Sequence, residues 1–119
     1  MNKKHKSRHP YKTASTENLK ERKTQILDLL QIPENIIRSS LITCNIKCGK
    51  ANCRCAKGEG HKNFYLSSYY HGHTYMDYVS KPIADKVADC IHSYEKIYSL
   101  IVELSEINLE LFRRKELEL

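Results

Sequence analysis

Residues 64–79 read FYLSSYYHGHTYMDYV, and the pattern of this stretch determines the expected architecture. Two runs rich in aromatic residues, FYLSSYY and HTYMDYV, favour extended strands. They are joined at His71-Gly72, where the glycine can supply the positive φ of a tight hairpin turn. The stretch therefore predicts an antiparallel β-hairpin. Pairing outward from the turn gives the expected register, with Tyr69 opposite Thr74 and Leu66 near Asp77.

A third strand is expected before the hairpin, because an isolated two-stranded hairpin is marginal in water. Residues 36–47, IIRSSLITCNIK, alternate in part as a strand does. Leu41 and Thr43 lie on one side of this segment, and Ile42 and Cys44 lie on the other. We therefore expect a three-stranded antiparallel sheet.

Helices are expected before and after the sheet. In residues 16–31, Thr16 can cap the N-terminus and Pro33 ends the helix. The apolar face of this helix is formed by Leu19, Ile26, Leu27, Leu29 and Leu30. No glycine or proline occurs from Ile83 to Leu119, which predicts one long helix. The predicted fold class is α+β.

The long helix carries apolar residues at heptad spacing, with Asn108 as the one polar member of the series. Such a seam is typical of coiled coils, and a buried Asn favours two chains in register. The apolar stripe is wider than a two-helix seam, which suits a helix that also packs on its own chain. We therefore expect a homodimer in which the C-terminal half of this helix meets a second copy. The predicted interface residues are Ile97, Ile101, Leu104, Asn108 and Leu111.

The chain is expected to divide into a disordered basic arm (1–15), a central module (16–80) and a dimerisation helix (81–119). The formal net charge of +6 is concentrated near the N-terminus and around the cysteines, while the long helix is acidic. Basic zones of this kind favour a polyanionic partner, most often nucleic acid. The alternative interpretation is a solvated tail that keeps the protein soluble.

A cysteine-rich loop, CGKANCRCAKGEGH at residues 48–61, lies between the first two predicted strands. Without an export signal, close-set thiols bind metal or do redox chemistry more often than they form disulfides. Three sulfurs and one imidazole are a suitable donor set for a structural Zn²⁺ ion. The paired CxxC spacing is absent, so a metal-free loop and a redox or iron–sulfur role stay open. The predicted ligands are Cys48, Cys53, Cys55 and His61, with Cys44 as an alternative.

Basic residues alternate with these predicted ligands, namely Lys47, Lys50, Arg54, Lys57 and Lys62. Around a bound ion they would point outward, as in a zinc knuckle that contacts phosphates. The alternative explanation is that charged residues occur here because a small loop has no interior and all its side chains meet solvent. Aromatic residues of the sheet can stack on unpaired bases. We expect most of them to pack, and Tyr69 and Tyr70, near the hairpin tip, to be exposed.

These features predict a metal-stabilised module that binds nucleic acid, DNA rather than RNA. The alternative is a protein-interaction adaptor that uses the long helix and binds no nucleic acid. No paired carboxylates, nucleophile elbow or phosphate-binding glycine loop occurs, so we expect no enzymatic activity. No stretch approaches the roughly 18 apolar residues of a membrane span, and no signal peptide is evident, which favours the cytoplasm.

The segment SLITCNIKCGKANCRCAKGEGHKNFYLSSY, followed by ELSEINLELFRR, resembles a prokaryotic family of small domains with no established activity. That family shares a pattern close to CGK-x-NCxC and a long C-terminal helix, and the resemblance covers about residues 39–114. It implies that Cys48, Cys53, Cys55 and His61 are shared positions and that Cys44 is not. Family members often lie near transposon genes, so the resemblance implies an association with mobile elements. We therefore expect an accessory or regulatory role for such an element.

Overall fold

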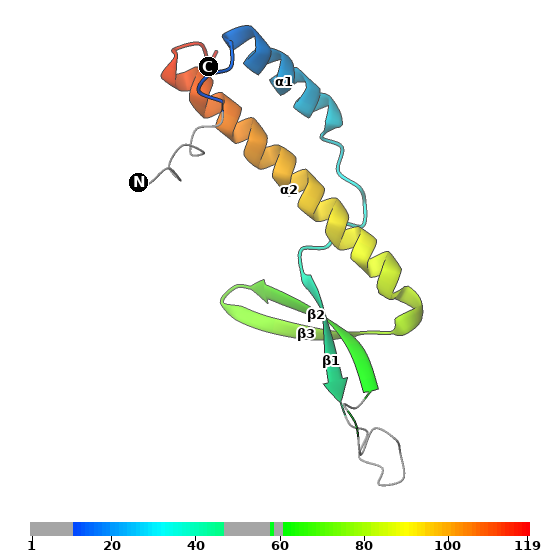
Figure 1. The fold of residues 1–119 in the computed structure, drawn as a ribbon. Coiled ribbons are helices and arrows are strands. Elements are labelled where there is room, and N and C mark those ends of the chain that lie inside the picture. Colours follow the sequence, from blue (N-terminus) through cyan, green and yellow to red (C-terminus); the bar gives the residue numbers. More distant parts are fainter. Residues whose placement is uncertain (1–10, 47–57, 59–60) are drawn as a thin grey trace. The chain divides into compact units, whose positions relative to one another are not determined.

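The computed structural model describes residues 11–46, 58 and 61–119 (Figure 1). The helices are α1 (Thr16–Leu29) and α2 (Ala84–Arg113), and a short 3-10 turn, η3 (Lys81–Ile83), precedes α2. The strands are β1 (Ser40–Ile46), β2 (His61–Tyr70) and β3 (His73–Val79). The α+β class is confirmed.

The three strands form an antiparallel sheet in the order β1-β2-β3. Tyr69 pairs with Thr74 and Leu66 with Asp77, so the predicted hairpin register is confirmed. Both turn residues have positive φ, 53° at His71 and 83° at Gly72, as a two-residue hairpin loop requires. The strand predicted from residue 36 begins later, at Ser40.

Helix α1 has its N-cap one residue earlier than predicted. Ser15, not Thr16, has extended backbone geometry, and its hydroxyl accepts a hydrogen bond from the Asn18 backbone N–H at 3.0 Å. An N-cap side chain bonds the third helical residue, so this geometry makes Thr16 the first helical residue. The helix ends at Leu29, two residues before the predicted end.

Helix α2 ends at Arg113, although the sequence predicted a helix to Leu119. Lys115 adopts the left-handed conformation, with φ of 63°. The backbone N–H of Lys115 donates to the Phe112 carbonyl at 2.9 Å, and that of Glu116 donates to the Leu111 carbonyl at 2.8 Å. This pair of bonds is a Schellman motif, which ends a helix and usually places glycine where Lys115 lies. Because lysine replaces that glycine, no sequence signal marks this end.

The chain folds as two compact units, and the boundary between them runs through α2. The first unit, the helical unit, comprises residues 1–32 and 96–119, and the second, the sheet unit, comprises residues 33–95. This division differs from the expected boundary after residue 80. The difference arises because the two ends of α2 pack against different segments of the chain.

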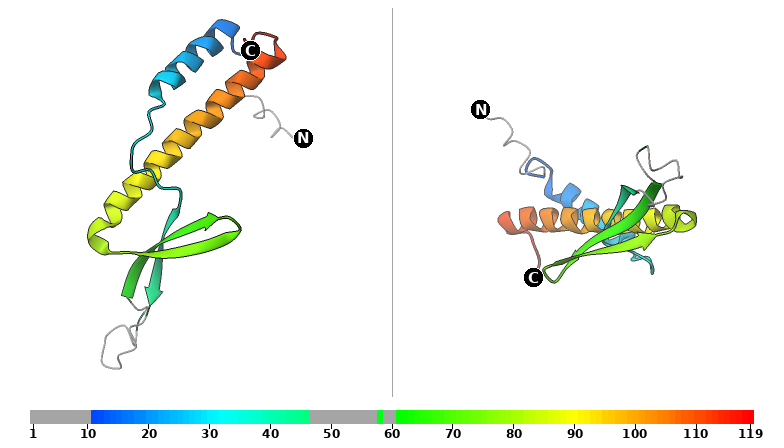
Figure 2. Two further views of the ribbon diagram at one scale, coloured as in Figure 1. Left: turned by 180° about the vertical axis from the view of Figure 1, so that it is seen from behind. Right: turned by 90° about the horizontal axis from the view of Figure 1, so that it is seen from below.

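The helical unit has a core between α1 and the C-terminal half of α2, which run side by side in Figure 1 and in the left view of Figure 2. Its buried members are Leu19, Ile26, Leu100, Ile107 and Leu111. The apolar face predicted for α1 is confirmed at Leu19 and Ile26. Leu27 and Leu29, which were assigned to the same face, are exposed.

Of the arm expected at residues 1–15, residues 1–10 lie outside the described residues, and residues 11–15 contact the helical unit. The Tyr11 side chain packs against the helical core, and Arg114 joins the segment to α2. The Arg114 guanidinium donates to the carbonyls of Tyr11 and Lys12 at 3.2 and 3.0 Å and to Thr16 Oγ1 at 3.1 Å. Its Nε donates to Glu110 Oε2 at 2.8 Å.

Glu103 joins Tyr11 and α1 to α2. Its carboxylate accepts from Arg22 Nε at 2.8 Å and Nη2 at 2.9 Å, and from the Tyr11 hydroxyl at 2.6 Å. The hydrogen bond from Arg22 lowers the pKa of Glu103 below its ordinary range. Burial, followed by the hydrogen bond to Glu103, raises the pKa of Tyr11 to about 12.

The stability of the helical unit is expected to decrease at low pH as Glu103 becomes protonated. Its folded-state pKa lies below the ordinary value of 4.5, so the stabilisation is present above that pH and is lost as pH decreases below it. Glu103→Gln should therefore cost about 1–2 kcal/mol in unfolding free energy at pH 7 and progressively less below pH 4.5. Urea unfolding at several pH values measures this difference. Glu21→Gln, at an exposed position of α1, should show no such trend. A Glu103→Gln deficit that stayed constant down to pH 2.5 would contradict the assignment.

Candidate nucleic-acid interface

The register of the sheet assigns its residues to two faces, because residues directly opposite each other lie on the same face. We name each face after a residue that it carries. The Tyr78 face includes the row Ile42, Tyr65 and Tyr78, one residue from each strand. The rings of Tyr65 and Tyr78 meet edge to face, with centroids 5.7 Å apart. The Val79 face carries Leu41, Phe64, Leu66, Tyr70, Tyr75 and Val79.

Several large side chains of the Tyr78 face are exposed. Tyr69 is 62% exposed, Tyr78 is 61% exposed and Met76 is 50% exposed. The sequence predicted exposure for Tyr69, which is confirmed, and it did not single out Tyr78 among the aromatic residues, most of which it expected to pack. Tyr75, on the other face, is also 49% exposed. All residues of β3 before Val79 are exposed, so this strand is exposed on both faces.

Tyr70 is exposed at its edge, as predicted, but its ring is engaged by Arg38. The Arg38 guanidinium carbon lies 4.3 Å from the ring centroid, a cation–π geometry. The Tyr70 hydroxyl donates to the Arg38 carbonyl at 3.1 Å, and Arg38 Nη2 donates to the Tyr69 carbonyl at 2.8 Å. This arrangement ties the residues before β1 to the end of β2. The Arg38 guanidinium also covers one face of the Tyr70 ring, on which the sequence predicted that a base could stack.

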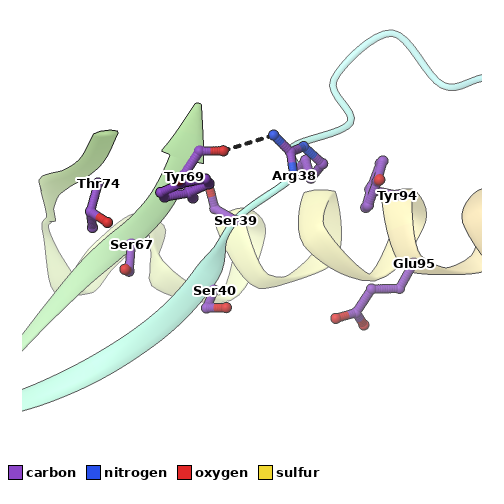
Figure 3. A pocket seen from close by; sticks show the side chains of 8 residues that line it. All are labelled: Arg38, Ser39, Ser40, Ser67, Tyr69, Thr74, Tyr94 and Glu95. Carbon is purple, nitrogen blue, oxygen red and sulfur yellow. Dashed lines mark hydrogen bonds between the residues drawn. The ribbon is translucent and has the colours of Figure 1, made fainter. Parts of the chain in front are cut away.

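A polar cavity of about 330 Å³ adjoins Tyr69 within the sheet unit (Figure 3). Ser40, Ser67 and Thr74 line it from the sheet, and they share the Tyr78 face with Tyr69. Tyr94 and Glu95 of α2 line it as well, together with Arg38 and Ser39. The hydroxyls of Ser39 and Ser68 hydrogen-bond to each other. The cavity therefore offers hydroxyl groups beside an exposed aromatic ring, a combination suited to sugar and phosphate oxygens.

The predicted metal ligands Cys48, Cys53 and Cys55 lie outside the described residues. His61 is the first residue of β2 and pairs with Ile46, the last residue of β1. Cys44 pairs with Asn63, is half-buried, and forms no disulfide. Positions 44, 46, 61 and 63 thus share the Tyr78 face. Among the residues that the structure describes, no group of three or more His, Cys, Asp or Glu is placed to hold a metal ion.

Four of the five predicted loop cations, Lys47, Lys50, Arg54 and Lys57, also lie outside the described residues. Lys62 is exposed on β2 opposite Asn45, on the Val79 face. The structure therefore does not bring Lys62 and Tyr69 to one face of the sheet. The loop that carries the other cations leaves β1 after Ile46 and enters β2 at His61, at one end of the Tyr78 face.

The five predicted dimer residues are divided between the core and the surface of the helical unit. Leu111 is buried in the core with α1, and Leu104 packs against that core. Ile97 is buried as well, and Asn108 Oδ1 is buried without a hydrogen-bond partner among the described residues. Of the five, Ile101 alone is exposed. Helix α1 therefore covers part of the seam that the sequence assigned to a second chain.

The class of the molecule is thus a small α+β protein with one antiparallel sheet and a long C-terminal helix. Residues 16–89, more than half of the chain, match a family described as a domain of unknown function (DUF6788), and the chain belongs to that family. No curated protein and no solved structure matches the chain. Within the described residues, neither helix combines the length and apolar character that a membrane crossing needs.

Proposed function

We propose that the sheet unit binds nucleic acid by stacking unpaired bases on the Tyr78 face. The observation that carries the proposal is the exposure of Tyr69 and Tyr78 on the sheet face that also carries the pair Ile46–His61, the last described pair before the cysteine loop. Every base has a π-face, so exposed aromatic rings accept bases of any sequence.

The spacing along the strands supports this mode of binding. Tyr65, the neighbour of Tyr78, lies four residues from Tyr69 in one direction and four residues from His61 in the other. Each interval is roughly 13 Å at the rise of a β-strand. A strand of nucleic acid along this face would thus meet the serine-lined cavity, two aromatic positions and then the loop cations. The cations would contact phosphates, and the rings would contact bases.

The proposal includes a structural Zn²⁺ ion held by the loop, and it includes no catalytic step. The pairing of Ile46 with His61 supports the metal site, because it brings the two ends of the loop to adjacent strands. In the sequence, Cys48 comes two residues after Ile46, so only a short segment separates it from the Ile46–His61 pair. Such an ion would contribute folding energy to the loop and would orient its cations.

Binding of fluorescent single-stranded oligonucleotides of mixed sequence across a salt series tests the proposal. The affinity should fall steeply with salt, because phosphate contacts release counterions. Tyr78→Ala and Tyr69→Ala should each weaken binding about 5- to 100-fold, the usual effect of removing one stacking ring. DNA should bind more tightly than RNA of the same sequence.

Tyr75→Ala is the matched control, since Tyr75 is an exposed tyrosine of β3 on the opposite face. It should change the affinity less than about twofold. Equal losses for Tyr75→Ala and Tyr78→Ala would exclude the Tyr78 face as the binding surface. No binding at low ionic strength would exclude the function itself.

A protein-interaction adaptor is the second candidate, and the exposed apolar residues of α2 favour it. In that case the chain would bind no nucleic acid, and α2 would accept the helix of another protein. The link to mobile elements, which the sequence resemblance implies, stays a prediction under either function.

A further inference from the structure

Helix α2 has a second heptad series beside the predicted one. Its members are Tyr98, Val102, Ser105, Leu109 and Phe112, each one residue after a member of the predicted seam. Their steps of 4, 3, 4 and 3 residues place them within an arc of about 80° on the helix. We call this set the outer stripe.

The outer stripe lies on the side of α2 away from α1. Leu100, Ile107 and Leu111, which pack in the core with α1, are about half a turn around the helix from its centre. The four large members of the stripe are 38% to 60% exposed, and Ile101 beside them is 49% exposed. Ser105 at the centre is exposed as well. None of these residues is charged, so the stripe is an uncharged surface, largely apolar, with the polar Ser105 at its centre.

The area of the outer stripe is close to what a weak dimer needs. Tyr98 and Phe112 are more than half exposed, so each contributes on the order of 100 Å² of accessible surface. With the aliphatic members, the patch reaches on the order of 500 Å², at the upper end of what monomers expose. Two such patches bury about 1,000 Å², near the lower limit for specific interfaces.

The residues of the outer stripe are spaced symmetrically about Ser105, so the stripe can pair with the same stripe of a second copy. Tyr98 and Phe112 lie seven residues before and after Ser105, and Ile101 and Leu109 lie four residues before and after it. In a parallel pair each of these residues meets its own copy. In an antiparallel pair Tyr98 meets Phe112 and Ile101 meets Leu109, and in both directions Ser105 faces Ser105. The small central residue lets the two helix axes approach to about 8–10 Å.

We propose that two copies of this chain associate through the outer stripe, with their Ser105 residues opposite each other. This surface differs from the predicted seam, most of which packs within the chain. The proposal goes beyond nucleic-acid binding and does not depend on it, since the stripe belongs to the helical unit.

Sedimentation equilibrium without nucleic acid tests the association. The chain should be largely dimeric at about 100 µM and should dissociate on dilution to about 1 µM, as expected for an interface of this size. Leu109→Lys should raise the dissociation constant at least about 10-fold, because it places two charges in the apolar interface. The matched control is Leu27→Lys, at an equally exposed position of α1, which should leave the constant unchanged.

Cross-linking tests the register. On mild oxidation, the Ser105→Cys variant should form a disulfide between the introduced thiols of its two copies, identified by mass spectrometry of the linked peptide. The Ser99→Cys variant, changed at an exposed position of the same helix but off the stripe, should not form the corresponding link. Phe112→Cys should link to itself only in a parallel dimer, since in an antiparallel one its two copies are roughly 21 Å apart. A monomer at all concentrations, or efficient linking in the Ser99→Cys variant and none in the Ser105→Cys variant, would overturn the proposal.

Discussion

Leu111→Ala is expected to destabilise the helical unit by about 2–5 kcal/mol in unfolding free energy. Leu111 is 1% exposed, and it lies in the core with Leu19, Ile26 and Ile107. Truncation removes apolar contacts with α1 and leaves a cavity, and only a local collapse could refill it. Urea unfolding followed by the helical circular dichroism signal measures the loss.

Leu27→Ala is the matched control, because it makes the same change at a helical position that is 53% exposed. It should cost less than about 1 kcal/mol. Equal costs at Leu111 and Leu27 would mean that α1 does not pack on α2 as described.

Amide hydrogen exchange shows which elements the Leu111→Ala substitution destabilises. Because the chain forms two compact units, faster exchange is expected in α1 and in the C-terminal half of α2. The amides of β1, β2 and β3 should keep their wild-type rates. Faster exchange throughout the sheet would show that the two units unfold as one.

The sheet could be predicted from the sequence because its determinants are local. The pair His71-Gly72 sets a two-residue turn, and a turn of known length determines every pair along the hairpin. The end of α2 was missed because Lys115 occupies a left-handed position that glycine usually marks. The sequence pattern could not indicate that lysine accepts this conformation there.

The heptad pattern predicted an apolar stripe on α2, but it could not distinguish cover by a second chain, which was expected, from cover by α1. A helix buries such a stripe equally well against α1 or against a second chain. Leu104 and Leu111 pack with α1, while the neighbouring series from Tyr98 to Phe112 stays exposed. Only the position of α1, which depends on contacts far apart in sequence, separates the two series.

The candidate site was predicted in part. Tyr69 was identified from its place near the turn, which is a local signal. The contact of Arg38 with Tyr70 joins residues 32 positions apart, and no local pattern predicts it. Tyr78 was missed because aromatic residues in strands usually pack, and the sequence did not show that β3 is exposed on both faces.

Each chain is expected to bind one Zn²⁺ ion, and Cys53→Ser should weaken that binding at least about 100-fold, since a serine hydroxyl stays protonated and is a poor zinc ligand. Metal analysis of the purified protein, followed by competition with a chelator, measures both. Cys90→Ser is the matched control: Cys90 lies in α2 and forms no disulfide, and its loss should leave the metal content unchanged. A wild-type protein free of metal, when purified without chelator, would contradict the site.

Removal of the ion should affect the sheet unit and spare the helical unit. The loop is attached to β1 and β2 at Ile46 and His61, so without the ion the paired ends of these strands should exchange their amides faster. The helical signal of α1 and α2 should persist, because the core around Ile26 and Ile107 contains no predicted ligand. Loss of the helical signal on chelation would contradict this expectation, because it would mean that the ion also stabilises the helical unit.

The fourth ligand is decided by comparing His61→Ala with Cys44→Ser. Both positions lie on the Tyr78 face next to the loop, so the register alone allows either residue to complete a tetrahedral site. The family resemblance favours His61, and His61→Ala should then lower the affinity for zinc while Cys44→Ser leaves it unchanged. Cobalt substitution gives an independent readout, since sulfur-to-cobalt charge-transfer absorption increases with each thiolate. If cobalt has three thiolate ligands both in the wild type and in Cys44→Ser, the ligand set is Cys3His. If it has four in the wild type and three in Cys44→Ser, the fourth ligand is Cys44 and not His61.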